Sequence, residues 1–109
     1  MSTTVIDADA PLVTLINVFT VDPSRQDELF EALSKSTQEL FTGLPGFISA
    51  NFHTSLDGTQ VVNYAQWASE EAFQGMLRTP AAQEHMAEIM TIASKVAPQL
   101  YAVRATFKP

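Results

Sequence analysis

Residues 60–73 read QVVNYAQWASEEAF and join a strand directly to the start of a helix. Side chains alternate across an extended chain, so Asn63 and Trp67 lie on the same face of this strand. Ser69, followed by two glutamates, is typical of a helix N-terminus, where a hydroxyl accepts a hydrogen bond from a free backbone N–H. The stretch therefore predicts a sheet that packs against helices.

A tight turn precedes this strand. Asp57-Gly58 is a strong hairpin signal, because glycine readily adopts the positive φ that such turns require. The residues before it, 47–56 (FISANFHTSL), alternate in the manner of a strand. We therefore expect residues 47–56 and 60–68 to pair antiparallel.

The chain after the helix start is expected to hold a helix in two parts. The first part breaks at Thr79-Pro80, since proline suits the first turn of a helix and not its interior. The second part is expected to run until Pro98. Its apolar face consists of Met86, Ile89, Met90 and Ala93. Residues 99–107 then form the last strand.

The N-terminal half opens with residues 12–21, LVTLINVFTV, whose β-branched and aromatic content predicts a strand buried on both faces. Asp22-Pro23 suits a helix start, and residues 23–42 carry apolar side chains at helical spacing. These are Leu29, Leu33, Leu40 and Phe41. Residues 1–11 are small, polar and acidic, so we expect a flexible arm followed by a single domain at 12–109.

The element order is β-α-β-β-α-β, the ferredoxin-like pattern of an α+β domain with an antiparallel sheet. The helices can cover only one face of that sheet. The other face would expose an apolar patch on the order of several hundred Å². Its residues are Ile16, Val18, Val62 and Tyr64. We therefore expect two chains to pack sheet against sheet as a homodimer, which gives a dimeric α/β-barrel.

Composition limits the possible partners. The chain has 109 residues, 46% of them hydrophobic, which suffices for one core. A formal net charge of −6 disfavours nucleic acid and anionic membranes. No apolar run approaches the roughly 18 residues of a membrane span, and the N-terminus lacks a signal-peptide pattern, so we expect a cytoplasmic protein. Without cysteine, thiolate nucleophiles and disulfides are excluded.

Asn17, Asn63 and Trp67 are the candidate catalytic residues. Asn17 shares a face with Leu15 and Phe19, so it is an amide in an apolar setting. A buried amide without partners costs about 1–3 kcal/mol, so both asparagines need hydrogen bonds from protein, water or a ligand. Each residue alone has an ordinary structural explanation. Together, two amides and an indole N–H in an apolar cavity are typical of a small-molecule site.

Further residues are candidates for contacts with a substrate. They are His53, Phe73, Met86, Met90 and Arg104. His53 belongs to the polar side of its strand, opposite Ile48, Ala50 and Phe52. That side faces either solvent or the pocket, and in the second case His53 is a base that works near neutral pH. Arg104, in the last strand, can pair with an acid or hold a phenolate. His85 is expected to be half-exposed and non-catalytic.

Several kinds of site are missing from the sequence. The two histidines do not form the i, i+4 pair of a helical metal site. No Gly-rich turn is present to hold a dinucleotide or flavin phosphate, and no elbow motif supports a serine nucleophile. The sequence therefore predicts a site without a metal or an organic cofactor.

Four segments resemble the antibiotic biosynthesis monooxygenase family. They are NVFTV with Asn17, LPGF at 44–47, VNYAQW with Asn63 and Trp67, and SEEAF at 69–73. The similarity is greatest to the small members that oxidise polyketide anthrones to anthraquinones without a cofactor. It implies catalytic roles for Asn17, Asn63 and Trp67, an aromatic polyketide substrate, and dioxygen as the oxidant. His53 coincides with a pocket histidine in some members, and Phe73 stands where some carry tyrosine.

Three other functions stay open. One is a stress-related or quinol-oxidising monooxygenase outside antibiotic pathways, because the shape of the pocket and not a motif sets the substrate. Haem-degrading monooxygenases share the fold and an Asn/Trp pair, but they need an axial histidine about ten residues after the tryptophan, where this chain has Leu77. Alternatively, the chain is a non-catalytic polyketide-binding or assembly protein that uses the same pocket. Oxygen uptake with a panel of anthrones separates an enzyme from a binder.

Overall fold

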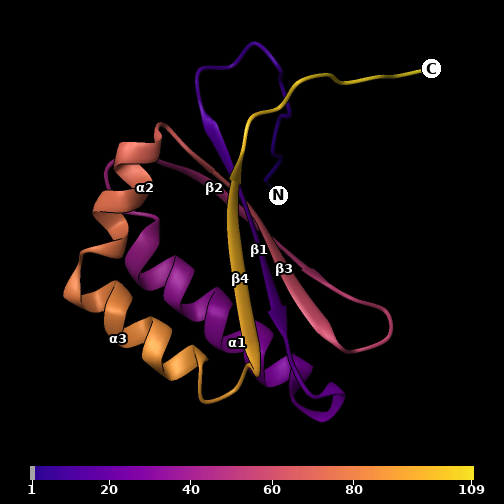
Figure 1. The fold of residues 1–109 in the computed structure, drawn as a ribbon, viewed down its shortest axis with the longest axis vertical. Helices are drawn as coiled ribbons and strands as arrows, with labels where there is room; N and C mark the ends of the chain where they lie inside the picture. The colour runs from indigo at the N-terminus through magenta and orange to yellow at the C-terminus, as the bar shows by residue number, and fades with distance from the viewer. Residues whose placement is uncertain (1) are drawn as a thin grey trace.

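Residues 2–109, the part described by the computed structural model, form a four-stranded sheet with helices between the strands. The elements are β1 (Val13–Thr20), α1 (Gln26–Ser36), β2 (Phe47–Thr54), β3 (Gln60–Trp67), α2 (Glu70–Leu77), α3 (Pro80–Ile89) and β4 (Lys95–Tyr101). Strand pairs are antiparallel, in the order β2-β3-β1-β4, and Figure 1 shows the three helices on one face. The predicted ferredoxin-like α+β fold is confirmed. Within the described residues, no helix combines the length and apolar character needed to cross a membrane.

Alternation in β1 and β3 places the core on the helical side of the sheet. Leu15 and Phe19 of β1 are buried there. Val61 and Ala65, their partners on β3, are buried as well. Helices α1 and α3 pack on the Phe19 end of this layer, and α2 packs on the Leu15 end through Phe73. The helical face of the sheet is thus the one that can carry a buried site.

Strand β2 departs from simple alternation at its start. A β-bulge between Phe47 and Ser49 interrupts its pairing with β3. The extra residue leaves Ile48 47% exposed and brings Phe47 to the helical face. Simple alternation predicted that Ile48 shares a face with Phe52. This prediction is wrong, because a bulge shifts the parity of every residue before it.

The first helix ends in a widened turn. Residues Thr37–Phe41 form a π-helical segment, η2, in which the N–H of Thr42 donates to the carbonyl of Thr37 at 3.1 Å. A π turn holds one more residue than an α turn, and of the two residues predicted to face inward here, Phe41 lines the cavity and Leu40 does not. Leu40 is 36% exposed. The rest of the helix predicted at residues 23–42 is confirmed: it consists of the 3-10 turn η1 (Pro23–Arg25) followed by α1.

Helix α3 ends at Ile89, well before the predicted end at Pro98. Pro98 lies instead within β4, opposite Asn17 of β1. An edge strand such as β4 tolerates proline, because one of its sides has no ladder that needs the missing N–H. The predicted helix end is therefore wrong. The predicted strand at 99–107 is also displaced, since β4 ends at Tyr101.

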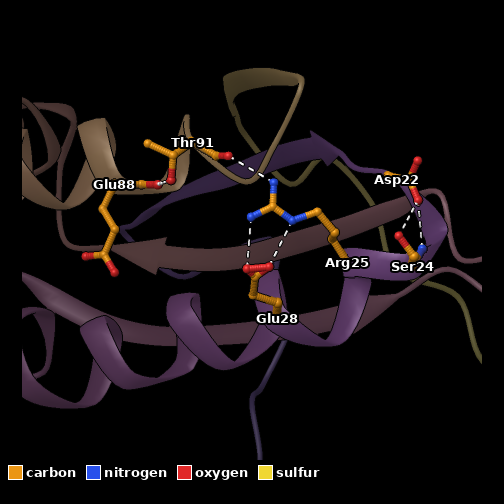
Figure 2. Close-up of polar contacts among 6 residues, drawn as sticks. All are labelled: Asp22, Ser24, Arg25, Glu28, Glu88 and Thr91. Atoms are coloured by element: carbon orange, nitrogen blue, oxygen red, sulfur yellow. Dashed lines mark hydrogen bonds and ion pairs between the residues drawn. The ribbon is translucent and has the colours of Figure 1, made fainter.

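Arg25 links the start of α1 to the end of α3 (Figure 2). Its Nε and Nη2 atoms each donate to the carboxylate of Glu28 at 2.9 Å. Its Nη1 atom donates at 3.1 Å to the carbonyl of Thr91, in the turn after α3. Asp22 caps η1 beside it by accepting from the N–H of Ser24. These exposed contacts tie together two helices that cover the same end of the sheet.

The face of the sheet away from the helices carries the N-terminal arm. Thr4 Oγ1 donates to Asn51 Oδ1 at 2.6 Å, and Gln66 Nε2 donates to the carbonyl of Val5 at 2.8 Å. The apolar residues of this open face are half-buried in the single chain. They are Ile16, Val18, Val62 and Tyr64. The two hydrogen bonds show where the arm lies, and its flexibility stays a prediction.

Candidate active site

A cavity of about 490 Å³ lies between the sheet and its helices. All four strands contribute to its floor, and α1, η2, α2 and α3 contribute to its roof. A cavity of this size holds a small organic molecule. Its walls are mostly apolar and aromatic, so the few polar side chains that reach it determine what it can bind.

The floor carries its amides in one row across the sheet. The register of β1 and β3 places Asn17 directly opposite Asn63. On the outer sides of this pair lie Pro98 of β4 and Phe52 of β2. Directly opposite side chains on antiparallel strands have Cβ atoms about 4.5–5.5 Å apart. The two amides are therefore close enough to act on one group of a ligand.

The two amides differ in what they already bind. Asn63 Oδ1 accepts from the backbone N–H of Asn51 at 3.3 Å, a long bond that directs the oxygen toward β2 and leaves Nδ2 free to donate. Asn17 is 6% exposed, and its Oδ1 has no hydrogen-bond partner among the described residues. An unpartnered buried amide costs about 1–3 kcal/mol, which a ligand that completes its hydrogen bonds recovers.

Trp67 closes one end of the floor. It is 2% exposed, and its ring packs edge-to-face against Phe47 and Phe73 with centroid distances of 5.5 and 6.1 Å. Trp67 lies on the same strand face as Asn63, and about 13 Å of extended chain separates their Cα atoms. This spacing suits a flat molecule of several fused rings, which can contact the amide row and the indole together.

The roof contributes His85, which the sequence pattern had placed at the edge of the apolar face of its helix. Helix α3 turns Ala82, His85 and Ile89 inward, at the three- and four-residue spacing of one helix face. His85 is 5% exposed and lines the cavity. Its ring meets that of Phe41 edge-on, with centroids 5.5 Å apart. The expectation that His85 is half-exposed is wrong, although its spacing from Ala82 and Ile89 carried the signal.

The imidazole of His85 is desolvated and unpaired. Its Nδ1 atom is buried without a hydrogen-bond partner in the described part of the chain. Burial lowers the pKa of His85 below its ordinary value of 6.5, and the nearby carboxylate of Glu88 opposes this shift only in part. The imidazole is therefore neutral at physiological pH and free to accept a proton.

Phe73 and Met86 are the two predicted substrate contacts that the structure brings to the cavity. Phe73 is 7% exposed and packs on Trp67 from α2. Met86 follows His85 on the inward side of α3. Both add apolar surface beside the floor and carry no ionisable group.

His53, Met90 and Arg104 lie outside the cavity, which corrects their predicted placement. His53 is exposed on the open face of the sheet, where its Nδ1 lies 3.2 Å from the carbonyl oxygen of Asn51. Met90 is 49% exposed, because α3 ends at Ile89, which is the last of its inward-facing residues. Arg104 lies in the exposed segment after β4, which runs away from the domain in Figure 1.

Hydrophilic side chains at the cavity are mostly neutral. Besides the amide row and His85, they are Thr37, Glu70, Gln74, Gln83 and Gln99. Glu70, at the start of α2, is the one carboxylate among them. Residues 2–109 contain no cluster of three histidine, aspartate or glutamate side chains that could hold a metal ion. The arrangement offers hydrogen-bond donors, one neutral base and a shielded aromatic surface.

Sequence comparison places the chain among known oxygenases. Residues 12–88 match the profile of the family described as antibiotic biosynthesis monooxygenase. Over 80 residues the chain is 50% identical to the tetracenomycin-F1 monooxygenase of Streptomyces glaucescens, and the match covers 73% of this chain and 71% of that relative.

Solved structures give a similar result. A monooxygenase from the gene ActVA-Orf6 of Streptomyces coelicolor, in complex with the ligand nanaomycin D, has a TM-score of 0.81 and 32% identity, over 94% of this chain and 96% of that one. SnoaB, a cofactor-independent oxygenase from Streptomyces nogalater, has a TM-score of 0.73 and 25% identity, over 92% of this chain and 100% of that one. The likeness therefore extends over nearly the whole domain.

Proposed function

The chain belongs to the antibiotic biosynthesis monooxygenase family, and we propose that it oxidises an aromatic polyketide anthrone, or a related polycyclic phenol, to the quinone with dioxygen. The predicted class, a cofactor-independent monooxygenase, agrees with its relatives. The observation that carries the choice of substrate is the cross-strand pair Asn17 and Asn63 in an apolar cavity that ends at Trp67.

An anthrone supplies the electrons for this reaction itself. Ground-state dioxygen is a triplet and reacts slowly with closed-shell molecules, which is why many oxygenases use a flavin or a metal. Loss of a methylene proton gives an extended enolate, which passes one electron to dioxygen. The resulting radical and superoxide combine to a peroxide, and loss of water leaves the quinone carbonyl. The two methylene hydrogens and one oxygen atom leave as that water, while the other oxygen atom stays in the quinone.

The protein then has three tasks: to favour the anion, to hold it beside dioxygen and to exclude bulk water. The free Nδ2 of Asn63 donates to the oxyanion of the enolate or peroxide, and the amide of Asn17 assists from the opposite strand. Trp67 packs its ring on the polycycle and orients it through the indole N–H. Phe73 and Met86 complete the apolar walls.

The active form is proposed to be a homodimer in which two open sheet faces pack together. The support for it is the half-buried apolar group at the centre of that face, Ile16, Val18, Val62 and Tyr64. A second chain would bury these side chains without closing the cavity, which lies on the other side of the sheet.

The test is oxygen uptake and quinone absorbance with pure protein and a panel of tricyclic anthrones and four-ring naphthacenones. We expect one dioxygen consumed per quinone formed, at a rate far above buffer and unchanged by metal chelators. Rates equal to buffer across the panel would contradict the proposal. Tight binding of the anthrones with no oxygen uptake would identify a binding or assembly protein instead.

A further inference from the structure

His85 is the one imidazole among the residues that line the cavity. A histidine that serves only to fill a core normally pairs its ring nitrogens, because an unmatched buried polar atom costs about 1–3 kcal/mol. His85 has no such pairing at Nδ1, which is sealed from solvent within the described structure. This leaves Nε2 as the nitrogen through which the ring can meet a ligand.

The charges around His85 leave it neutral. Glu88, one turn further along α3, favours the charged imidazolium, and Glu70 is the carboxylate that reaches the cavity from α2. Phe41 of η2 covers the ring, and the floor strands present no ionisable side chain to the cavity. Burial outweighs the acidic neighbours and lowers the pKa of His85. A desolvated neutral imidazole is suited to accept a proton.

We propose that His85 is the catalytic base of this site, and that its Nε2 atom takes the methylene proton of the anthrone. The inference rests on the oxygenase function proposed above and adds the proton acceptor that this function requires. It also separates the two tasks in space. The amide row of the floor binds the oxygen of the substrate, while the histidine of the roof works at the methylene carbon on the other side of the central ring.

The proton balance closes with this single residue. The C–H bond of the methylene breaks, an N–H bond forms on His85, and the electron pair stays in the enolate. After dioxygen has added, the imidazolium returns its proton to the terminal oxygen of the peroxide. The neutral ring then removes the second methylene hydrogen as hydroxide leaves, the carbonyl forms, and the proton and hydroxide combine as water.

His85→Gln tests the proposal, because the amide is polar but does not titrate. We expect kcat to fall by about 10²–10⁴-fold, the usual contribution of a general base, with a small change in KM. For the wild type, kcat/KM should fall at acidic pH with a break below 6.5, which is the sign expected for a base whose pKa is lowered. That break should be absent from His85→Gln, whereas any break from ionisation of the substrate appears in both proteins.

A structural role for His85 would not produce two further results. An anthrone deuterated at its methylene should show a larger isotope effect with His85→Gln than with the wild type. His85→Ala should regain activity in proportion to the neutral imidazole added to the buffer. The matched control is His53→Gln, which changes the other histidine, on the opposite face of the sheet, and should keep the wild-type rate and pH profile.

The outcomes are distinguishable. A wild type without oxygen uptake overturns the proposed function itself. An active wild type together with a folded His85→Gln that keeps its kcat and its acidic break overturns only the role of His85. Should both His85 variants fail to fold, the wild type decides alone, since a kcat/KM without an acidic break over the whole pH range in which the protein stays folded excludes an essential neutral histidine.

Discussion

Asn17 and Asn63 show how a single residue acquires its role from its neighbours. Both are strand asparagines of the same parity, yet only Asn63 has its oxygen engaged, by the backbone of Asn51. This bond orients Asn63 as a donor before any ligand arrives, whereas the buried Oδ1 of Asn17 has no hydrogen-bond partner among the described residues. An oriented donor stabilises developing charge without a cost of rearrangement at the moment of reaction.

Asn63→Ala should therefore lower kcat by about 10²–10³-fold, the usual loss for one oxyanion donor. KM should change less, because the lost hydrogen bond strengthens as charge develops in the reaction. Oxygen uptake at saturating anthrone measures this effect. His53→Ala alters a side chain on the open face and should keep the wild-type rate, so equal losses in the two variants would contradict the assignment.

Among the elements, the loop before β2 positions Phe47, which lines the cavity. Gly46 has a φ of +82°, and its carbonyl accepts from the N–H of Ala68 at 2.7 Å. This places the loop against α2, beside Ala72. Phe47 is the next residue and packs on Trp67, so the position of the loop affects the position of the tryptophan.

Gly46→Ala should reduce the free energy of unfolding by about 2–4 kcal/mol. The new Cβ would collide with the Cβ of Ala72, and a side chain is strained at this positive φ. Gly43→Ala is the matched control in the same loop, because a Cβ added there would have no neighbour within 4 Å and its φ is not positive. Urea unfolding should show a change of less than about 1 kcal/mol there, and a similar loss in both would argue against this reason.

The hairpin between β2 and β3 contains a carboxylate that links its geometry to pH. Asp57 Oδ1 accepts from the N–H and hydroxyl of Thr59 and from the hydroxyl of Ser55, and these bonds lower the pKa of Asp57 to about 2. The ordinary value is 3.8, so the stabilisation is complete above 3.8 and is lost as the pH falls toward 2.

Asp57→Asn keeps an oxygen acceptor at this position and removes the charge. The wild type should be the more stable protein at neutral pH, and its advantage should shrink once the pH drops below 3.8. Urea unfolding of both proteins at neutral and acidic pH measures the difference. A difference that stays constant with pH would show that the charge of Asp57 makes no contribution.

In the whole molecule, the two faces of the sheet carry different features. The helical face holds the cavity, while the open face carries the arm at one end and half-buried aliphatic side chains toward the other. Val18 and Val62 pair across β1 and β3 on this open face. A second copy of the chain is proposed to cover them. The catalytic residues of each copy would then lie on the helical face of its own sheet, away from the dimer interface.

Val18→Asp should therefore convert the protein from a dimer to a monomer, because an unpaired charge in an apolar interface is strongly unfavourable. Sedimentation analysis would measure the mass of both proteins. Met90→Asp introduces the same charge at an exposed position on the helical side and should remain dimeric. A monomeric wild type would contradict the proposed dimer.

Local patterns in the sequence were sufficient to show which residues share a face. Alternation along a strand is a local property, so the common parity of Leu15, Asn17 and Phe19, and of Asn63 with Trp67, could be read without any partner strand. The element order and the hairpin at Asp57-Gly58 followed from equally local signals. These local patterns were enough to predict the fold and three residues that the structure brings to one cavity.

Which residues contact one another depended on long-range packing. The register that places Asn17 opposite Asn63 depends on strand pairing over a long sequence separation. The bulge at Ile48 and the π turn at Thr37–Phe41 each shift inward positions by one residue, and neither leaves a strong local signal. The places of the two histidines depended on packing in the same way. The sequence left the face of His53 open and predicted a half-exposed His85, whereas in the folded chain His53 lies at the surface and His85 is buried.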